Sequence, residues 1–208
     1  MKDLQAKKKG VTEKLKAFVP PGFEGMVADL LYRDPVSFKI VPPRNTKLGD
    51  FRAGINGQKH QITVNGDLNP YSFLITTLHE FAHLEAYVKY GHKIRPHGEE
   101  WKATYRNLLL PAIDSGLLPK DILNALVASL ANTKASSCSD VRLYRVLKGY
   151  DKPKEGVVLL ESLPKNTTFA LQGKNFVKGE LRRQRYLCEE VSGKRKYLVH
   201  ALSEVVPL

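Results

Sequence analysis

The residues most able to do chemistry lie in the segment HEFAH, which spans His79 to His83. Two histidines four residues apart on a helix present their rings on one face, so both can reach a single metal ion. Glu80 lies one residue further round that helix, where its carboxylate could accept a proton from an attacking water. The pattern predicts a catalytic zinc centre with His79 and His83 as ligands and Glu80 as general base.

A third ligand has to come from elsewhere, because catalytic zinc ions usually take three protein ligands and leave the fourth position open. The nearby candidates downstream are His92, His97, Glu99 and Glu100. His97 is favoured, since Pro96 and Gly98 flank it at a rigid corner that could return its ring to the helix. A carboxylate from one of the two glutamates is the alternative, while His92 is expected in an exposed turn.

The HEFAH segment is predicted to lie in the middle of a long helix. Asn69 and Pro70 supply an N-cap and a first-turn proline, and Gly91 supplies the terminating residue. Apolar residues occupy most sides of this helix, so it is expected to be central in its domain. Two further helices are expected, at about 98–110, where Pro111 halts the first, and at about 120–130.

The N-terminal part of the chain is predicted to contain two helices and a small β-meander. The helices are expected at about 3–18 and 23–33, the first of them stopped by Pro20 and Pro21. Runs rich in β-branched and aromatic residues then follow, separated by Pro-Pro and Asn-Gly turn signals. The three strands of the meander are expected at 36–41, 48–55 and 61–64.

These segments together resemble the SprT-like family of zinc metallopeptidases, which includes the Spartan proteases. The resemblance covers about Val36–Pro111 and rests on NTKLGDFRAGINGQKHQITVNGDL, LHEFAH and PHGEEW. An I-x-x-N-x-x-L phrase is met by Ile62, Asn65 and Leu68, and a His-Gly pair followed by an aromatic is met at 97, 98 and 101. The resemblance implies that His97 is the third zinc ligand. It also implies a zincin-like fold and hydrolysis of proteins, including proteins crosslinked to DNA.

The C-terminal third has a different sequence pattern, and the segment ANTKASSCSD at 131–140 is interpreted as the linker that precedes it. Short β-prone runs follow at 141–146, 157–160, 167–171, 179–188 and 197–202, which predicts a small antiparallel barrel or sheet. We therefore expect an α+β protein. A zincin-like catalytic domain with meander, HExxH helix and further helices spans 1–135, and a basic, β-rich, barrel-like domain spans 136–208.

The net charge of +12 and the pI near 9.6 favour a polyanionic partner such as DNA. Residues 141–208 hold 14 Lys and Arg against 7 Asp and Glu, so the excess is concentrated there. Cations and one stacking ring on two candidate strands are the predicted nucleic-acid contacts: Lys174, Lys178, Arg182, Arg183, Arg185 and Tyr186. A solvated sheet face explains the same residues equally well.

Two cysteines, Cys138 and Cys188, are too few for a four-cysteine zinc site and are expected to be free thiols. The chain shows neither a signal-peptide pattern nor an apolar run of membrane-spanning length, so a cytoplasmic protein without membrane contact is expected. The predicted function is zinc-dependent endoproteolysis of protein substrates. The alternatives are a DNA-binding protein with a non-catalytic zinc and a module whose basic tail recruits a protein partner.

Overall fold

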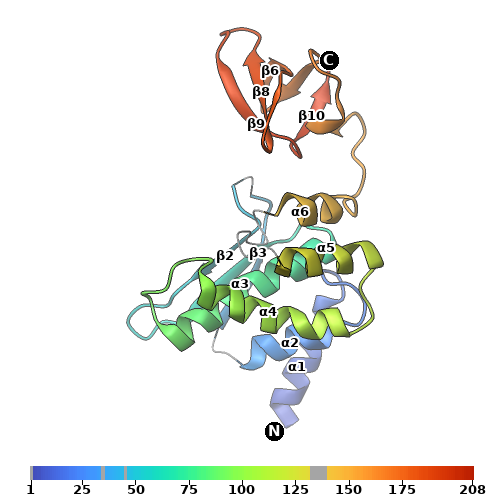
Figure 1. Cartoon of the computed structure of the whole chain (residues 1–208). Coiled ribbons are helices and arrows are strands. Elements are labelled where there is room, and N and C mark those ends of the chain that lie inside the picture. Colours follow the sequence, from blue (N-terminus) through green and yellow to red (C-terminus); the bar gives the residue numbers. More distant parts are fainter. Residues whose placement is uncertain (1, 34–35, 45, 132–139) are drawn as a thin grey trace. The chain divides into compact units, whose positions relative to one another are not determined.

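The computed structural model describes residues 2–33, 36–44, 46–131 and 140–208 (Figure 1). The chain divides into two compact units, residues 1–151 and residues 152–208. Cys138 and most of the predicted linker lie outside the described residues. No helix in the described ranges combines the length and the apolar character needed to cross a membrane.

The first unit contains a three-stranded sheet and six helices within the described residues. Its strands are β1 (Val36–Val41), β2 (Gly49–Arg52) and β3 (His60–Asn65). The helices are α1 (Lys2–Leu15), α2 (Glu24–Arg33), α3 (Pro70–Tyr90), α4 (Glu99–Asp114), α5 (Lys120–Ala131) and α6 (Val141–Lys148).

The sheet is not the predicted meander, because its order is β1-β3-β2 with β3 in the centre. β3 runs parallel to β1 and antiparallel to β2. The connection after β1 crosses the end of β3, where the Gly66 N–H donates to the Val41 carbonyl at 2.9 Å. A meander would leave the apolar Ile62 and Val64 on an edge strand, whereas the observed order buries both fully.

Helix α3 is the central element of the first unit, as its apolar pattern predicted. Asn69 caps it by accepting a hydrogen bond from the Ser72 N–H at 2.9 Å, and Gly91 ends it with φ 79°. Phe73 and Phe81 are fully buried against the sheet, and each contributes about 1.5–3 kcal/mol through burial. Figure 1 shows this helix between the sheet and α4.

Two expectations for the helices that follow α3 were wrong. Pro111 does not halt α4, which continues to Asp114 because Leu108, Leu109 and Ala112 are buried in the core and hold the last turn. Residues 141–148 form helix α6 and not a strand.

Helix α6 belongs to the first unit, so the division falls after Asp151 and not after the expected residue 135. The Asp140 carboxylate caps α6 by accepting from the backbone N–H groups of Arg142 at 3.0 Å and Leu143 at 3.2 Å. Leu143 and Leu147, four residues apart, are both buried in the core of the first unit. Capping and packing together explain why a β-prone sequence is helical here.

The second unit is a curled antiparallel sheet with a core of its own (Figure 1). Its strands pair in the order β4-β10-β5-β6-β8-β7, and β9 pairs with β8. The strands are β4 (Val158–Leu159), β5 (Thr168–Leu171), β6 (Lys174–Val177), β7 (Leu181–Arg182), β8 (Arg185–Glu190), β9 (Lys196–His200) and β10 (Glu204–Pro207). Antiparallel pairing was predicted, but β6 and β10 were not.

Candidate metal centre

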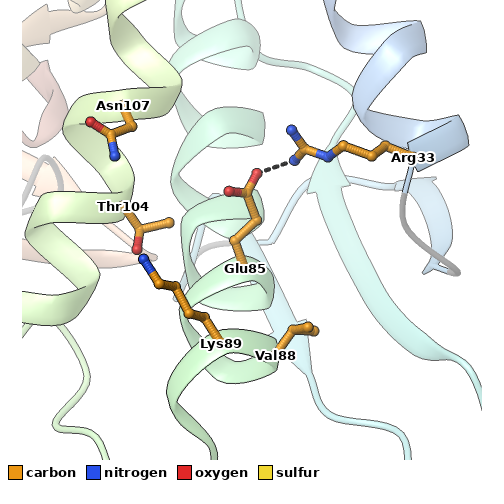
Figure 2. Close-up of a pocket in the computed structure, with 6 residues that line it drawn as sticks. All are labelled: Arg33, Glu85, Val88, Lys89, Thr104 and Asn107. Carbon is orange, nitrogen blue, oxygen red and sulfur yellow. Dashed lines mark hydrogen bonds and ion pairs between the residues drawn. The ribbon is translucent and has the colours of Figure 1, made fainter.

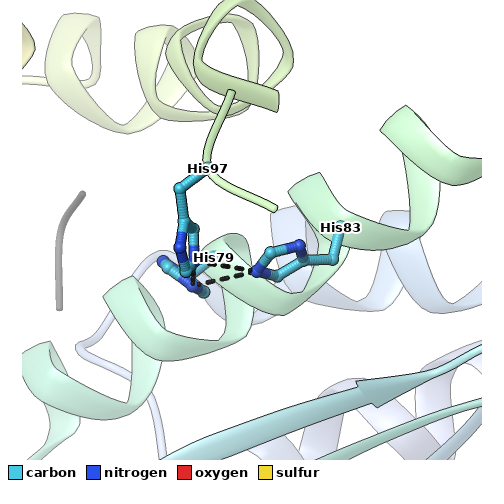
Figure 3. Close-up of side chains that lie close together, drawn as sticks. All are labelled: His79, His83 and His97. Carbon is cyan, nitrogen blue, oxygen red and sulfur yellow. Dashed lines mark hydrogen bonds between the residues drawn. The ribbon is translucent and has the colours of Figure 1, made fainter. Parts of the chain in front are cut away.

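Three histidine rings converge on one point in the first unit (Figure 3). The Nε2 atoms of His79, His83 and His97 lie 3.1–3.2 Å from one another. Among the described residues these three form a cluster that could hold a metal ion. Two ligands about 2.0–2.1 Å from one tetrahedral zinc ion are about 3.3 Å apart, so the observed spacing fits that ion.

Local geometry explains how the three rings meet. His79 and His83 stand one turn apart on α3, and His97 comes from the connection between α3 and α4. The backbone of His97 has φ 61°, a left-handed conformation that is costly for a residue with a Cβ. The Gly98 N–H donates to the Arg95 carbonyl at 2.9 Å and closes this turn just before α4 begins.

The electrostatic state of the three rings also suits metal binding. Burial, together with the neighbouring rings, lowers the pKa of His79 to about 2 and that of His83 to about 4. Burial likewise lowers the pKa of His97. The imidazoles are therefore neutral near pH 7, and a neutral imidazole is the form that ligates a metal.

Aromatic side chains of α4 form one wall of the cluster. The Trp101 ring centroid lies 4.6 Å from that of His79, 5.1 Å from that of His83 and 4.7 Å from that of His97. Tyr105 stacks on Trp101 at 4.9 Å. This apolar wall restrains the orientation of all three rings.

Glu80 lies beside the cluster and outside it, as its helical position predicted. Its side chain is 6% exposed, and the backbone N–H of Phe51 on β2 hydrogen-bonds its carboxylate. Burial raises the pKa of Glu80 to about 8, and the charge of Asp50 adds to this rise. The positive charges of Arg44 and Lys47 act in the opposite direction. A carboxyl group whose pKa lies near neutral pH is suited to accept a proton and to return it.

The strand β2 supplies the surroundings of Glu80, and the sequence contained no signal for this. A Cβ added to Gly49 would lie only 2.6 Å from Glu80 Oε1, so the β2 backbone touches the carboxylate. Asp50 forms ion pairs with Lys47 and with Arg52, both at 2.8 Å. Although burial raises the pKa of Asp50, these two cations outweigh it and lower the pKa.

The alternative ligands do not reach the cluster. The Glu99 carboxylate pairs with Lys102 at 3.0 Å, and neither Glu99 nor Glu100 belongs to the group of converging donors. His92 is exposed, as expected for a turn residue. The three-histidine set is therefore the donor set that the described residues bring together.

The predicted nucleic-acid contacts in the second unit separate into two groups. Lys178 is 3% exposed, its ammonium donates to the Glu161 and Leu163 carbonyls, and it lies 3.9 Å from the centre of the Tyr186 ring. Lys174 pairs with Glu190 at 2.9 Å. Lys178 is thus unable to contact phosphate, and Tyr186 is covered by it.

The three arginines of the second group lie together at the β7–β8 hairpin. Arg182 and Arg185 face each other in the strand register, with Arg183 in the turn between them. All three are exposed. No carboxylate pairs with them in the part of the chain that the structure describes.

A separate pocket of about 230 Å³ lies on another side of α3 (Figure 2). An ion pair between Arg33 and Glu85 forms part of its wall. Its lining residues are Arg33, Glu85, Val88, Lys89, Thr104 and Asn107. None of them belongs to the histidine cluster, so the pocket and the candidate metal centre are distinct.

The remaining cysteine of the described chain, Cys188, is a buried free thiol in the core of the second unit. Burial raises the pKa of this thiol, so it is mainly protonated near neutral pH. Cys188 is the free thiol that was predicted, and it has a packing role.

Comparison with known proteins identifies the part of the chain that carries the cluster. Residues 33–112 match the SprT-like family. No curated protein and no solved structure matches the chain. The matched segment includes β1, β2, β3, α3 and most of α4, and hence all three histidines and Glu80. The segment that carries the histidine cluster is therefore similar to the SprT-like family, a family of zinc-metallopeptidase-like proteins.

Proposed function

We propose that the chain is a zinc-dependent endopeptidase in which His79, His83 and His97 hold the metal. The observation that carries this proposal is the convergence of three neutral imidazoles beside a buried carboxylate that is not itself a ligand. Zinc bound there would act as a Lewis acid on the peptide carbonyl and would lower the pKa of the attacking water. The family assignment supports the same reaction class.

The residues of the chain divide the remaining work. Glu80 accepts the proton of the attacking water and later returns it to the leaving amine, which a group with a pKa of about 8 can do in both directions. The Phe51 N–H and the close backbone of Gly49 keep the carboxylate in place. Trp101 shields one side of the site and restrains the histidine rings.

The proposal is tested by cleavage of a disordered protein such as casein by the zinc-loaded full chain. Glu80→Gln should lower kcat by about 100- to 10,000-fold, the usual contribution of a general base. Glu85→Gln is the matched control, because Glu85 stands on the same helix but pairs with Arg33 away from the cluster. Cleavage that is unchanged in Glu80→Gln, or that survives complete removal of zinc, would exclude this mechanism.

We further propose that the second unit brings the peptidase to proteins bound on DNA. The support is the group of exposed arginines 182, 183 and 185 without carboxylate partners at one hairpin. Arginine binds phosphate oxygens well, so a nucleic-acid backbone fits this group by charge and by geometry. The rival function is DNA binding with a non-catalytic zinc. It predicts that the wild-type chain cleaves no protein and that Glu80→Gln leaves DNA affinity unchanged.

A further inference from the structure

A single buried amide holds the connection between β1 and β2. The side-chain NH₂ of Asn65, the last residue of β3, donates to the carbonyl of Arg44 at 3.2 Å and to that of Lys47 at 3.0 Å. Its Oδ1 accepts from Arg44 Nε at 2.8 Å, and its backbone N–H donates to the Leu48 carbonyl at 2.9 Å. Asn65 is 2% exposed, so these bonds are shielded from water. One residue thus fixes both ends of the segment that leads into β2.

Arg44 completes this clamp from the other side. Its Nη1 donates to the Thr63 hydroxyl at 3.0 Å, next to the bond that its Nε gives to Asn65. Its Nη2 is buried and has no hydrogen-bond partner among the described residues. The bonds of this guanidinium tie the connection to β3.

The clamped segment leads directly to the residue that receives the proton. Leu48 is followed by Gly49, whose backbone touches the Glu80 carboxylate, and two residues later the Phe51 N–H donates to that carboxylate. Within the described sheet, β2 pairs only with β3. The position of β2 therefore depends on its pairing with β3, on the packing of Phe51 against Tyr87 of α3 at 5.9 Å, and on the clamp at its start.

We propose that Asn65 is a positioning residue for Glu80, because the clamp sets the place of β2 and β2 sets the place of the carboxylate. The inference rests on the proposed function, in which Glu80 handles the proton. A misplacement of about 1 Å in a catalytic group can cost about a hundredfold in rate, so a clamp that ends at Leu48, next to the contact at Gly49, has a measurable effect. The positions of the three histidines and of Trp101 do not depend on this clamp.

The matched test compares Asn65→Ala with Asn69→Ala. Asn69 is also a buried asparagine, at 8% exposure, and its side chain bonds Ser72, the Leu147 carbonyl and Asp151, remote from β2. Asn65→Ala should lower kcat about 10- to 100-fold with KM changed less than about threefold, whereas Asn69→Ala should leave kcat within about threefold of wild type. Both variants should lose comparable stability and keep the zinc content of the wild type. Equal effects of the two variants on kcat would overturn the proposal.

A second readout needs no turnover. Amide hydrogen exchange at Phe51 reports whether β2 still rests on Glu80, and Asn65→Ala should speed this exchange at least about tenfold while Asn69→Ala leaves it unchanged. Unchanged exchange in Asn65→Ala also overturns the proposal. A wild-type chain that cleaves no protein counts against the proposed peptidase, and the exchange at Phe51 then decides the positioning role separately.

Discussion

Substitution of His97 by alanine and by glycine separates the metal ligation that we propose for it from its strained backbone. The left-handed conformation, with φ 61°, costs a residue with a Cβ about 1–2 kcal/mol, and glycine avoids this cost. Both substitutions remove the ring, and with it the contact at 4.7 Å to the Trp101 ring. The loss of packing therefore cancels when the two variants are compared with each other.

The expected loss of zinc affinity follows from the number of ligands. Four-ligand structural zinc sites bind with about 10–16 kcal/mol, or about 3 kcal/mol per ligand. Removing one of the three clustered donors should therefore weaken zinc binding by about a hundredfold in both variants. In the metal-free protein, by contrast, His97→Gly should be more stable than His97→Ala by about 1 kcal/mol, because only glycine relieves the strain.

The assay combines zinc competition against a chromophoric chelator with urea unfolding of the metal-free chain. Asn166, with φ 67° in the second unit, provides the control. Asn166→Gly and Asn166→Ala should differ in stability in the same sense and leave zinc affinity unchanged. Less than about a threefold loss of affinity in both His97 variants would refute ligation by this residue. Equal stability of His97→Gly and His97→Ala would refute the strained backbone.

Three further expectations follow from single contacts. Trp101 is the only tryptophan of the chain, and its ring contacts all three histidine rings. Co²⁺ bound at the cluster should therefore quench the tryptophan fluorescence with one-to-one stoichiometry. Unchanged fluorescence would place the metal elsewhere. Burial lowers the pKa of Lys178 in the folded protein below the value of 10.5. Between these two pKa values the unfolded state binds more protons than the folded state, so the free energy of unfolding rises with pH. Urea unfolding of Lys178→Met should lack this rise. If Arg182, Arg183 and Arg185 each contact one phosphate, these three contacts should lower the affinity for duplex DNA about 40-fold between 50 and 200 mM salt. In a binding titration, the triple alanine variant should lose this contribution to the salt dependence of the affinity.

Much of the candidate metal centre was predictable because its arrangement depends on local spacing. The i,i+4 pair His79 and His83 shares a helical face by geometry alone, and Asn69 and Gly91 mark the ends of that helix through capping rules that hold in any fold. Glu80 was assigned its place beside the metal for the same reason. The helix and its two ends are confirmed, because they depend on residues close in sequence. The roles of the histidines and of Glu80 at a metal stay predictions.

Features that depend on partners distant in sequence were predicted less well. The strand order β1-β3-β2 and the helical state of residues 141–148 follow from burial of Ile62, Leu143 and Leu147, which no local pattern revealed. Lys178 was expected among the exposed cations. The folded sheet instead buries it under Tyr186 and two carbonyl oxygens.

The sequence by itself determined the two histidines of α3, the glutamate between them and the elements that carry them. Only the tertiary structure decided that His97, and not Glu99 or Glu100, completes the cluster, and that β2 encloses the Glu80 carboxylate. The physical reason is that helix periodicity and capping act within a few residues. Ring convergence, desolvation and the pKa of a buried carboxylate arise only when packing brings distant segments into contact.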